Sequence, residues 1–169
     1  MKKLIVPALL AMLVLAGCTS GGAVASSPSS SSASSVKPTP TPTVMTNDEA
    51  GAKYLSIVCP GNKASIALDA AFTSGDIAQI TAAAASARDI YQTSALALAD
   101  TKILWPEGIA ADLKKLSDAQ FARVSFADQV SKATTFDEAN SIIYVNDDSG
   151  AVAQKVRAQL GLPASTTCE

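Results

Sequence analysis

Three pairs of adjacent acidic residues are the side chains of this sequence that could do chemistry. The pairs are Asp48 with Glu49, Asp137 with Glu138, and Asp147 with Asp148. Two carboxylates can serve as the acid and the base of a glycan hydrolase, or they can bind a cation. The first two pairs follow a threonine, in the patterns TNDE and TFDE that predict capped helix starts. Because negative charge in a first helical turn stabilises the helix dipole, we interpret both pairs as capping residues.

The third acidic pair lies in the segment VNDDSG at 145–150. This segment has the composition of a calcium loop but not its spacing, because an EF-hand needs acids at alternating positions and a later glutamate. The sequence contains no histidine, which excludes His-based triads, the usual zinc sites and haem ligation through histidine. Neither a GxGxxG nor a GxxxxGK[ST] motif occurs. We therefore expect no catalytic residue, no metal and no cofactor.

The first of the three cysteines ends an apolar run at the start of the chain. A basic head, Met1-Lys2-Lys3, precedes about a dozen apolar residues, too few to span a bilayer of roughly 30 Å as a helix. The run ends in LAGC at 15–18, which resembles the lipobox of bacterial lipoproteins. The resemblance implies that 1–17 is a signal peptide, and that Cys18 becomes a new N-terminus carrying diacylglycerol and palmitate-type acyl chains.

Residues 18–45 read as a lipid-anchored tether rather than as a folded segment. The stretch SSPSSSSASSVKPTPTPT offers almost no apolar area to offset the entropy cost of ordering. A Ser/Gly-rich chain of this length has a root-mean-square span on the order of 30 Å. We therefore expect the folded domain, at 46–169, to be held off the extracytoplasmic face of a cell membrane.

The other two cysteines, Cys59 and Cys168, are predicted to form a disulfide. Lipidation of Cys18 leaves this one pair, and an exported chain resides in an oxidising compartment. The bond would close a loop of about 110 residues, for which the chain-entropy model gives roughly 4–5 kcal/mol as an upper figure. The alternative is two free buried thiols.

The domain at 46–169 carries a net negative charge. It holds all fifteen acidic residues but only ten of the thirteen Lys and Arg, which leaves a balance of −5. This charge, without a basic stripe, argues against nucleic acid as a partner and against a second, electrostatic membrane contact. The chain also resembles small lipoproteins of actinobacteria, with YLSIVCPGN early and LGLP before a terminal cysteine. That resemblance implies no known activity.

Helix start and stop signals divide the domain into four segments of similar length. TNDE, SGD, WPEG, TFDE and LGLP mark the boundaries, with Pro106 in a first helical turn. The segments are 46–74, 76–104, 106–133 and 135–161. Apolar residues recur at threes and fours between these marks, and no long stretch alternates with period two. Short turns and similar lengths predict an all-α, up-down four-helix bundle.

The first and the fourth segment are predicted to be interrupted. Pro60 and Gly61 interrupt the first, and the fourth is interrupted near 146–150. An alternative fold has six shorter helices, in which 46–58 and 62–74 pack as a hairpin. In the four-segment fold, the tail LPASTTC can run back along the first segment and just reach Cys59.

Antiparallel packing places both predicted interruptions at the same height in the bundle. Helix interruptions leave N–H and C=O groups without intrahelical partners. We therefore predict a small polar pocket at Asn62, Asn146, Asp147 and Asp148, suited to a cation or a hydroxyl-bearing ligand. The alternative is that Asn62 and Asp148 only cap the helices that follow them.

Three classes of function remain after these exclusions. We favour a membrane-anchored binding or accessory module without catalytic activity, which recruits an envelope protein or a small ligand. The second class is a cell-envelope glycan hydrolase that uses carboxylates alone, although such enzymes usually need a deep cleft on a larger scaffold. The third class is a purely structural spacer.

Overall fold

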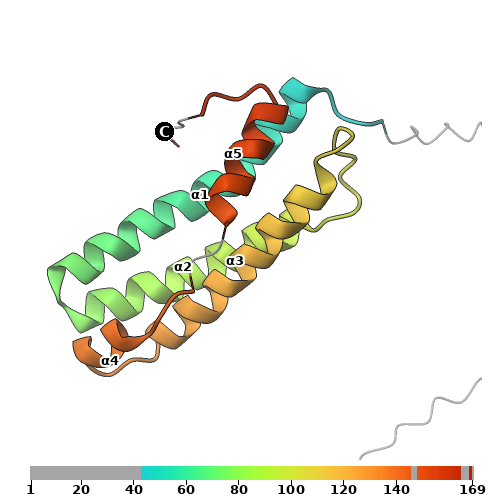
Figure 1. Ribbon diagram of the computed structural model, residues 1–169. Helices are drawn as coiled ribbons and strands as arrows, with labels where there is room; N and C mark the ends of the chain where they lie inside the picture. Colours follow the sequence, from blue (N-terminus) through green and yellow to red (C-terminus); the bar gives the residue numbers. More distant parts are fainter. Residues whose placement is uncertain (1–42, 146–147, 165–167, 169) are drawn as a thin grey trace, which may run out of the picture. The chain divides into compact units, whose positions relative to one another are not determined.

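The structure is a computed structural model of the chain, and it describes residues 43–145, 148–164 and 168. Within these ranges the chain forms five α-helices and no β-strand (Figure 1). The helices are α1 (Asn47–Ser74), α2 (Ile77–Leu98), α3 (Ala110–Val130), α4 (Phe136–Ser141) and α5 (Ser149–Gln159). None of these helices combines the length and the apolar character that crossing a membrane requires. The predicted all-α fold is confirmed, whereas the predicted signal peptide and Cys18 lie outside the described residues.

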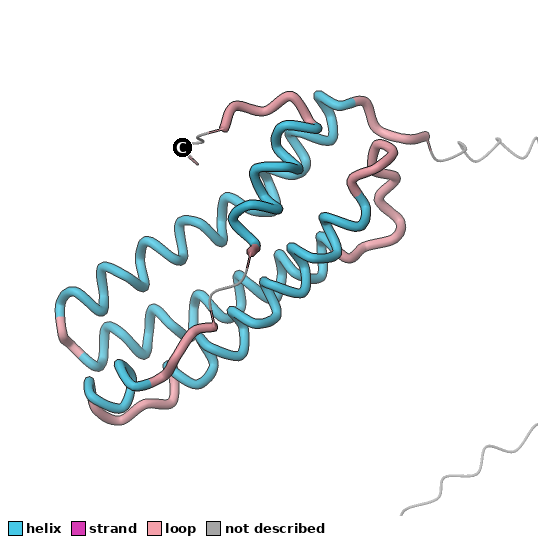
Figure 2. The backbone as a smooth tube through the Cα atoms, in the orientation of Figure 1, coloured by secondary structure: helices cyan, strands magenta, loops and turns pink. Residues whose placement is uncertain are grey.

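The helices run up and down in one bundle. Helices α1, α2 and α3 alternate in direction, and α2 packs against both of its neighbours (Figure 1). Helices α4 and α5 together form the fourth segment. Helix α4 packs against α2 at the end where α1 turns into α2, and α5 packs against α3 at the opposite end (Figure 2). The predicted interruption of the fourth segment is confirmed, and it begins at residue 142, earlier than expected.

Polar patterns start and stop α1, and start α2, as the sequence predicts. Thr46 and Glu49 form a capping box, in which Glu49 N donates to Thr46 Oγ1 at 3.3 Å and Thr46 N donates to Glu49 Oε2 at 2.8 Å. Gly75 ends α1 with a φ of 69°, a conformation that costs little without a Cβ. The Asp76 carboxylate then accepts hydrogen bonds from two backbone N–H groups at the start of α2.

The second predicted capping box forms only in part. Thr135 Oγ1 accepts a hydrogen bond from Glu138 N at 3.1 Å. The Glu138 carboxylate accepts from Thr134 N at 2.7 Å rather than from the N–H of Thr135. Both interactions supply partners at the start of the short helix α4, so the interpretation of Glu138 as a capping residue holds.

The end of α5 is a Schellman motif. Gly161 adopts a φ of 68°, Leu162 N donates to Arg157 O at 2.8 Å, and Gly161 N donates to Ala158 O at 3.2 Å. These two bonds satisfy carbonyls that the helix leaves open at its end. The pattern LGLP therefore ends the helix as predicted.

The predicted interruption of the first segment at 59–62 is wrong, because α1 continues as one helix through Pro60. Proline lacks the N–H that would bond the carbonyl four residues earlier. The next carbonyl along the chain, that of Ile57, accepts a hydrogen bond from Ser94 Oγ of α2 at 2.8 Å. Buried residues recur every three or four positions on both sides of the proline: Ala50, Tyr54, Ile57, Gly61, Ala64, Leu68 and Ala71. Because burial of this whole face stabilises the continuous helix, the alternative with six shorter helices is wrong.

The loop between α2 and α3 is longer than predicted, since it takes in residues 99–109. Pro106 therefore lies in this loop and not in a first helical turn. Asp100 explains the early end of α2, because its carboxylate accepts a hydrogen bond from Lys102 N at 2.9 Å and so favours a turn. Ile109 is 2% exposed and fixes the far end of the loop in the core.

The disulfide between Cys59 and Cys168 is present as predicted, with Cα atoms 5.1 Å apart. The tail that leads to it runs beside α1, because a Cβ added to Gly51 would lie 3.2 Å from Leu162 Cδ2. The described tail residues 162–164 are not helical, as expected, and residues 165–167 lie outside the described part. The end of α5 is thereby tied to the middle of α1.

Two clusters of buried apolar side chains fill the bundle. One lies toward the α1–α2 turn and includes Leu68, Ile80 and Val130, and the other lies toward the start of α1 and includes Tyr54, Leu113 and Val156. The two clusters take their α1 residues from 64–71 and from 50–58, respectively. The level of α1 between these ranges carries the disulfide and Asn62, and it is here that the packing becomes polar.

Candidate functional site

A cavity of about 420 Å³ lies between α1, α3 and α5. Small-ligand sites in proteins commonly enclose about 300–1,000 Å³, so this volume suits a small molecule rather than a single ion. Part of its wall is apolar and comes from Val58, Leu116, Ala119 and Ala153. The rest of the wall includes two arginines, three amide side chains and the first residues of α5. The lining of the cavity is therefore mainly polar, with a smaller apolar part from these four residues.

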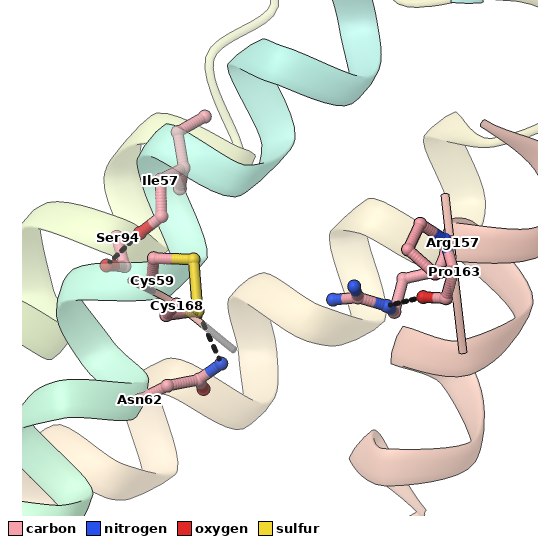
Figure 3. The surroundings of a disulfide bond; sticks show 7 residues. All are labelled: Ile57, Cys59, Asn62, Ser94, Arg157, Pro163 and Cys168. Carbon is pink, nitrogen blue, oxygen red and sulfur yellow. Dashed lines mark hydrogen bonds between the residues drawn. A yellow bond between two sulfur atoms is a disulfide. The ribbon is translucent and has the colours of Figure 1, made fainter. Parts of the chain in front are cut away.

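Arg157 of α5 is the charged group of this cavity, and it is 6% exposed. Its Nε donates to the carbonyl oxygen of Pro163 at 2.9 Å, and its Nη2 is buried without a hydrogen-bond partner. Figure 3 shows the guanidinium directed away from the α5 backbone, toward the side where Asn62 and Cys168 lie. No carboxylate is among the described residues that line the cavity. The charge of Arg157 is therefore enclosed without an opposite charge from these residues.

The buried carboxylate of Asp112 neutralises a different cation. Asp112 lies on α3 and is 4% exposed, and its Oδ2 is 2.7 Å from Lys155 Nζ of α5. Lys115 Nζ approaches the other carboxylate oxygen at 3.9 Å. The pair with Lys155 links α5 to α3, the pair with Lys115 lies within α3, and Arg157 has no carboxylate partner among the described residues.

Tyr54 lies in the cavity wall close to Arg157. Burial raises the pKa of the Tyr54 phenol, and the positive charge of Arg157 partly opposes this rise. The phenol is consequently neutral at physiological pH, because its ordinary pKa is already 10.0. Tyr54 can donate or accept a hydrogen bond in the cavity, but it does not neutralise the guanidinium.

Arg123 of α3 contributes a second guanidinium to the cavity wall. Its Cζ lies 5.9 Å from the ring centroids of both Tyr91 and Tyr144, and its Nε donates to Tyr144 Oη at 3.4 Å. Arginine above an aromatic face is stabilised by the ring quadrupole. The two tyrosines therefore hold Arg123 in place without cancelling its charge.

Gln120 and Arg123 lie on the inward face of α3 and are partly exposed. The inward positions of this helix recur at threes and fours: Ile109, Leu113, Leu116, Gln120, Arg123, Ala127 and Val130. Gln120 Oε1 is buried without a hydrogen-bond partner, and the side chain lies against the backbone of Gly61. Both polar residues replace apolar ones in this pattern, and both line the cavity. They were not predicted from the sequence, although the break in the α3 pattern was a usable signal.

The structure places the residues of the predicted polar pocket in different settings. Asn62 lines the cavity from within α1, and its Nδ2 donates to Cys168 Sγ at 3.4 Å. It does not cap a helix, since α1 is continuous. Asp148 is the N-cap residue of α5 without a side-chain capping bond, and it lines a smaller adjoining hollow with Lys115. Asn146 and Asp147 lie outside the described residues.

The described residues contain no group of three or more His, Cys, Asp or Glu that could hold a metal ion. The acidic pair of α1 and that of α4 lie in first helical turns, as interpreted from the sequence. A second hollow, of about 650 Å³, lies beside the α2–α3 loop and is mainly lined by apolar residues, including Trp105 and Phe121. It has no buried charged side chain, so the cavity at Arg157 is the stronger candidate.

No protein family, curated protein or solved structure matches this chain. The assignment of a function therefore depends on the residues of the chain and on the geometry of the cavity.

Proposed function

We propose that this chain is a lipid-anchored binding protein of the extracytoplasmic membrane face, which holds a small ligand in the cavity between α1, α3 and α5. The protein does so without catalysing a reaction. Its lipid on Cys18 is the contact with the membrane, and residues 19–45 separate the helical domain from the bilayer.

The anchoring part of the proposal is supported by the start of the sequence. A basic head, an apolar run and the lipobox-like LAGC occur in the order that lipoproteins require, and a Ser/Thr/Pro-rich stretch follows them. The disulfide between Cys59 and Cys168 also supports export, because such bonds persist in oxidising compartments. Two or three acyl chains would hold the protein firmly, since each buried CH₂ contributes about 0.8 kcal/mol.

The binding part of the proposal is carried by one observation, the buried and uncompensated guanidinium of Arg157 in a cavity of ligand size. A buried charge without an opposite partner is costly, so a fold that retains one suggests that a ligand supplies the partner. A glycan hydrolase needs two carboxylates that face each other across the substrate. The described residues that line this cavity include no carboxylate, so the cavity gives the glycan-hydrolase alternative no support.

The test is to purify the mature lipoprotein from membranes of its own cells in a mild detergent and to analyse it by native mass spectrometry. We expect an N-terminal peptide that begins with an acylated Cys18. We also expect a small molecule in near-stoichiometric amount, released when the protein is denatured. A processed Cys18→Ala protein that stays in the membrane would contradict the anchor. A protein free of any small molecule would contradict the binding function.

A further inference from the structure

We propose that the cavity binds a small organic acid, whose carboxylate pairs with the guanidinium of Arg157 and whose apolar body lies against α1 and α3. This inference rests on the proposed binding function and adds the chemical class of the ligand.

The charge of the cavity calls for an anion. Arginine remains protonated at any physiological pH, and Arg157 has no carboxylate partner among the described residues. Arg123 adds a second positive charge to the wall. The first turn of α5, at Ser149 and Gly150, also lines the cavity, and the N-terminus of a helix carries a partial positive charge. An anion paired with Arg157 would offset the first of these charges directly, whereas Ser149 lies eight residues earlier, about 12 Å along α5.

The geometry of Arg157 suits a carboxylate. Its Nε is already engaged by the carbonyl of Pro163, so a ligand can pair only with the terminal nitrogens, and the buried Nη2 becomes available only when the residues that cover it move. Arginine commonly binds a carboxylate through two parallel N–H···O bonds, which give direction as well as affinity. The bond to Pro163 also fixes the plane of the guanidinium before a ligand arrives, which reduces the entropy lost on binding.

A smaller part of the cavity wall is apolar and gives an organic molecule a contact that an inorganic anion lacks. Val58, Leu116, Ala119 and Ala153 offer apolar surface that neither phosphate nor sulfate could use. The buried Oε1 of Gln120 lacks a donor, so a hydroxyl or N–H group on the ligand would satisfy it. The cavity thus matches a monocarboxylate with an apolar body and a polar substituent.

The test uses the full mature lipoprotein in detergent, with benzoate, phenylacetate and 4-hydroxyphenylacetate as probes. Each acid is compared with its uncharged amide and with inorganic phosphate, by thermal unfolding and by ligand-observed NMR. We expect at least one acid to raise the unfolding midpoint in a dose-dependent way and its amide not to do so. Arg157→Met should weaken binding of that acid by about 10- to 100-fold, the loss of a charged hydrogen bond. Gln120→Leu should selectively weaken binding of the hydroxylated acid.

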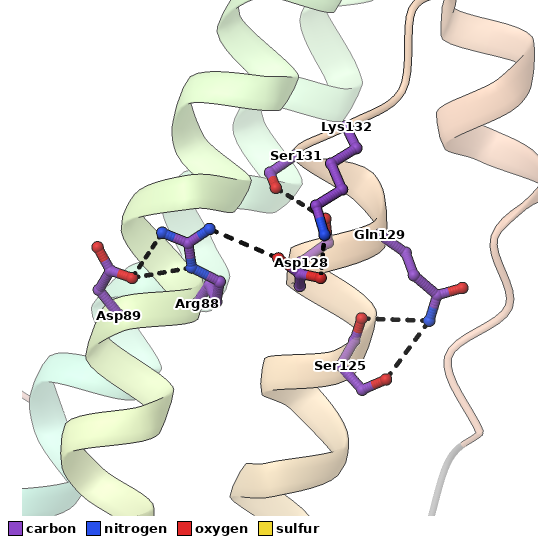
Figure 4. A network of polar contacts seen from close by, with 7 residues as sticks. All are labelled: Arg88, Asp89, Ser125, Asp128, Gln129, Ser131 and Lys132. Carbon is purple, nitrogen blue, oxygen red and sulfur yellow. Dashed lines mark hydrogen bonds and ion pairs between the residues drawn. The ribbon is translucent and has the colours of Figure 1, made fainter. Parts of the chain in front are cut away.

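The matched control is Arg88→Met, because Arg88 of α2 is an arginine outside the cavity. Its guanidinium pairs with Asp89 at 2.8 Å and with Asp128 of α3 at 3.5 Å (Figure 4). The control should leave binding of the acid unchanged. Far-UV circular dichroism and the unfolding midpoint without ligand establish that each variant folds.

Three outcomes would overturn the proposal. They are binding of phosphate without binding of any acid, equal binding of acids and amides, and an Arg157→Met protein that is folded and binds the acid as well as the parent does. In each of these cases the small molecule found in native mass spectrometry can still support the proposed binding function. The failure of the ligand class is therefore distinguishable from the failure of the function.

Discussion

Arg157 illustrates how a single side chain can be unfavourable for folding and useful for binding. Its neighbours Val156 and Leu160 are buried in the apolar cluster near the start of α1, and an apolar residue in its place would avoid the cost of desolvating a guanidinium. One hydrogen bond to Pro163 offsets only part of this cost. A ligand carboxylate would offset the rest, which couples binding to stability.

Gly61 is the residue at which a change should stabilise the protein. It lies inside α1 with helical geometry, and a Cβ there would be 3.7 Å from Tyr91 Cδ1 and 3.9 Å from Gln120 Oε1. These are ordinary van der Waals distances, so alanine fits without displacement. We expect Gly61→Ala to raise the free energy of unfolding by about 0.5–1 kcal/mol, because alanine loses less backbone entropy in a helix. Urea unfolding followed by circular dichroism measures this difference.

The matched control for this prediction is Gly75→Ala at the end of the same helix. Gly75 has a φ of 69°, and a side chain is strained in that conformation although nothing lies within 4 Å of the added Cβ. We expect this variant to lower the free energy of unfolding by about 1 kcal/mol or more. Equal effects of the two substitutions would contradict the continuous helix at Gly61.

At the scale of elements, the sequence predicted the helices well where local signals and burial agree. Thr46, Asp76 and Gly161 act where the sequence placed them, because caps and stops depend on neighbouring residues alone. Pro60 and Gly61 misled the prediction, because the buried face of α1 extends across both residues. The spacing of that face, in threes and fours from Ala50 to Ala71, was a sequence signal that outweighed the two breakers.

The residues of the cavity were harder to predict from the sequence than the helices. The sequence placed Asn62 near an interruption in a neighbouring segment, and Asn62 does line the cavity with the first turn of α5. Gln120 and Arg123 could have been found as polar residues in the apolar pattern of α3. Arg157 could not, since a basic residue in a last helical turn usually complements the helix dipole at the surface. Its burial depends on the tail that folds over it.

The capped helix starts make the stability of the protein dependent on pH. Hydrogen bonds from Thr46 lower the pKa of Glu49, and those from Thr134 lower the pKa of Glu138, both from an ordinary value of 4.5. In acid, the unfolded chain therefore takes up protons at these residues before the folded chain does. The stability that Glu49 and Glu138 contribute is present above pH 4.5. It is lost as the pH falls through the lowered pKa values of these two residues in the folded protein.

We expect the urea midpoint of the protein to decline as the pH is lowered from 4.5 toward 3. Glu49→Gln and Glu138→Gln should each make this decline shallower, because glutamine keeps an acceptor for the cap but does not titrate. Glu49→Ala serves as the comparison, since it removes the cap at every pH. The same pH dependence in the parent and in both glutamine variants would rule out this role.

At the scale of the whole molecule, one covalent bond closes both the fold and the cavity. From the end of α5 the tail passes Gly51, contributes Ala164 to the cavity wall and reaches Cys59 through Cys168. The same tail supplies the Pro163 carbonyl that holds Arg157. Global stability and the arrangement of the binding groups therefore depend on a single tie between the C-terminal tail and the middle of α1.

Opening this disulfide should consequently destabilise the domain and weaken binding together. The two cysteines are 109 residues apart, and a loop of that size corresponds to about 4–5 kcal/mol in the chain-entropy model. We expect reduction, or the Cys59→Ser plus Cys168→Ser variant, to lower the free energy of unfolding by about 3–5 kcal/mol in urea titrations. The folded fraction should also bind the carboxylate probe more weakly, because Pro163 no longer fixes Arg157. The reductant should have no effect on the double variant, which serves as its control. A loss of less than about 1 kcal/mol in the free energy of unfolding would contradict this prediction. Unchanged affinity for the probe in the folded, reduced protein would also contradict it. Either result would show that the tail stays in place without the bond and that the disulfide does not organise the cavity.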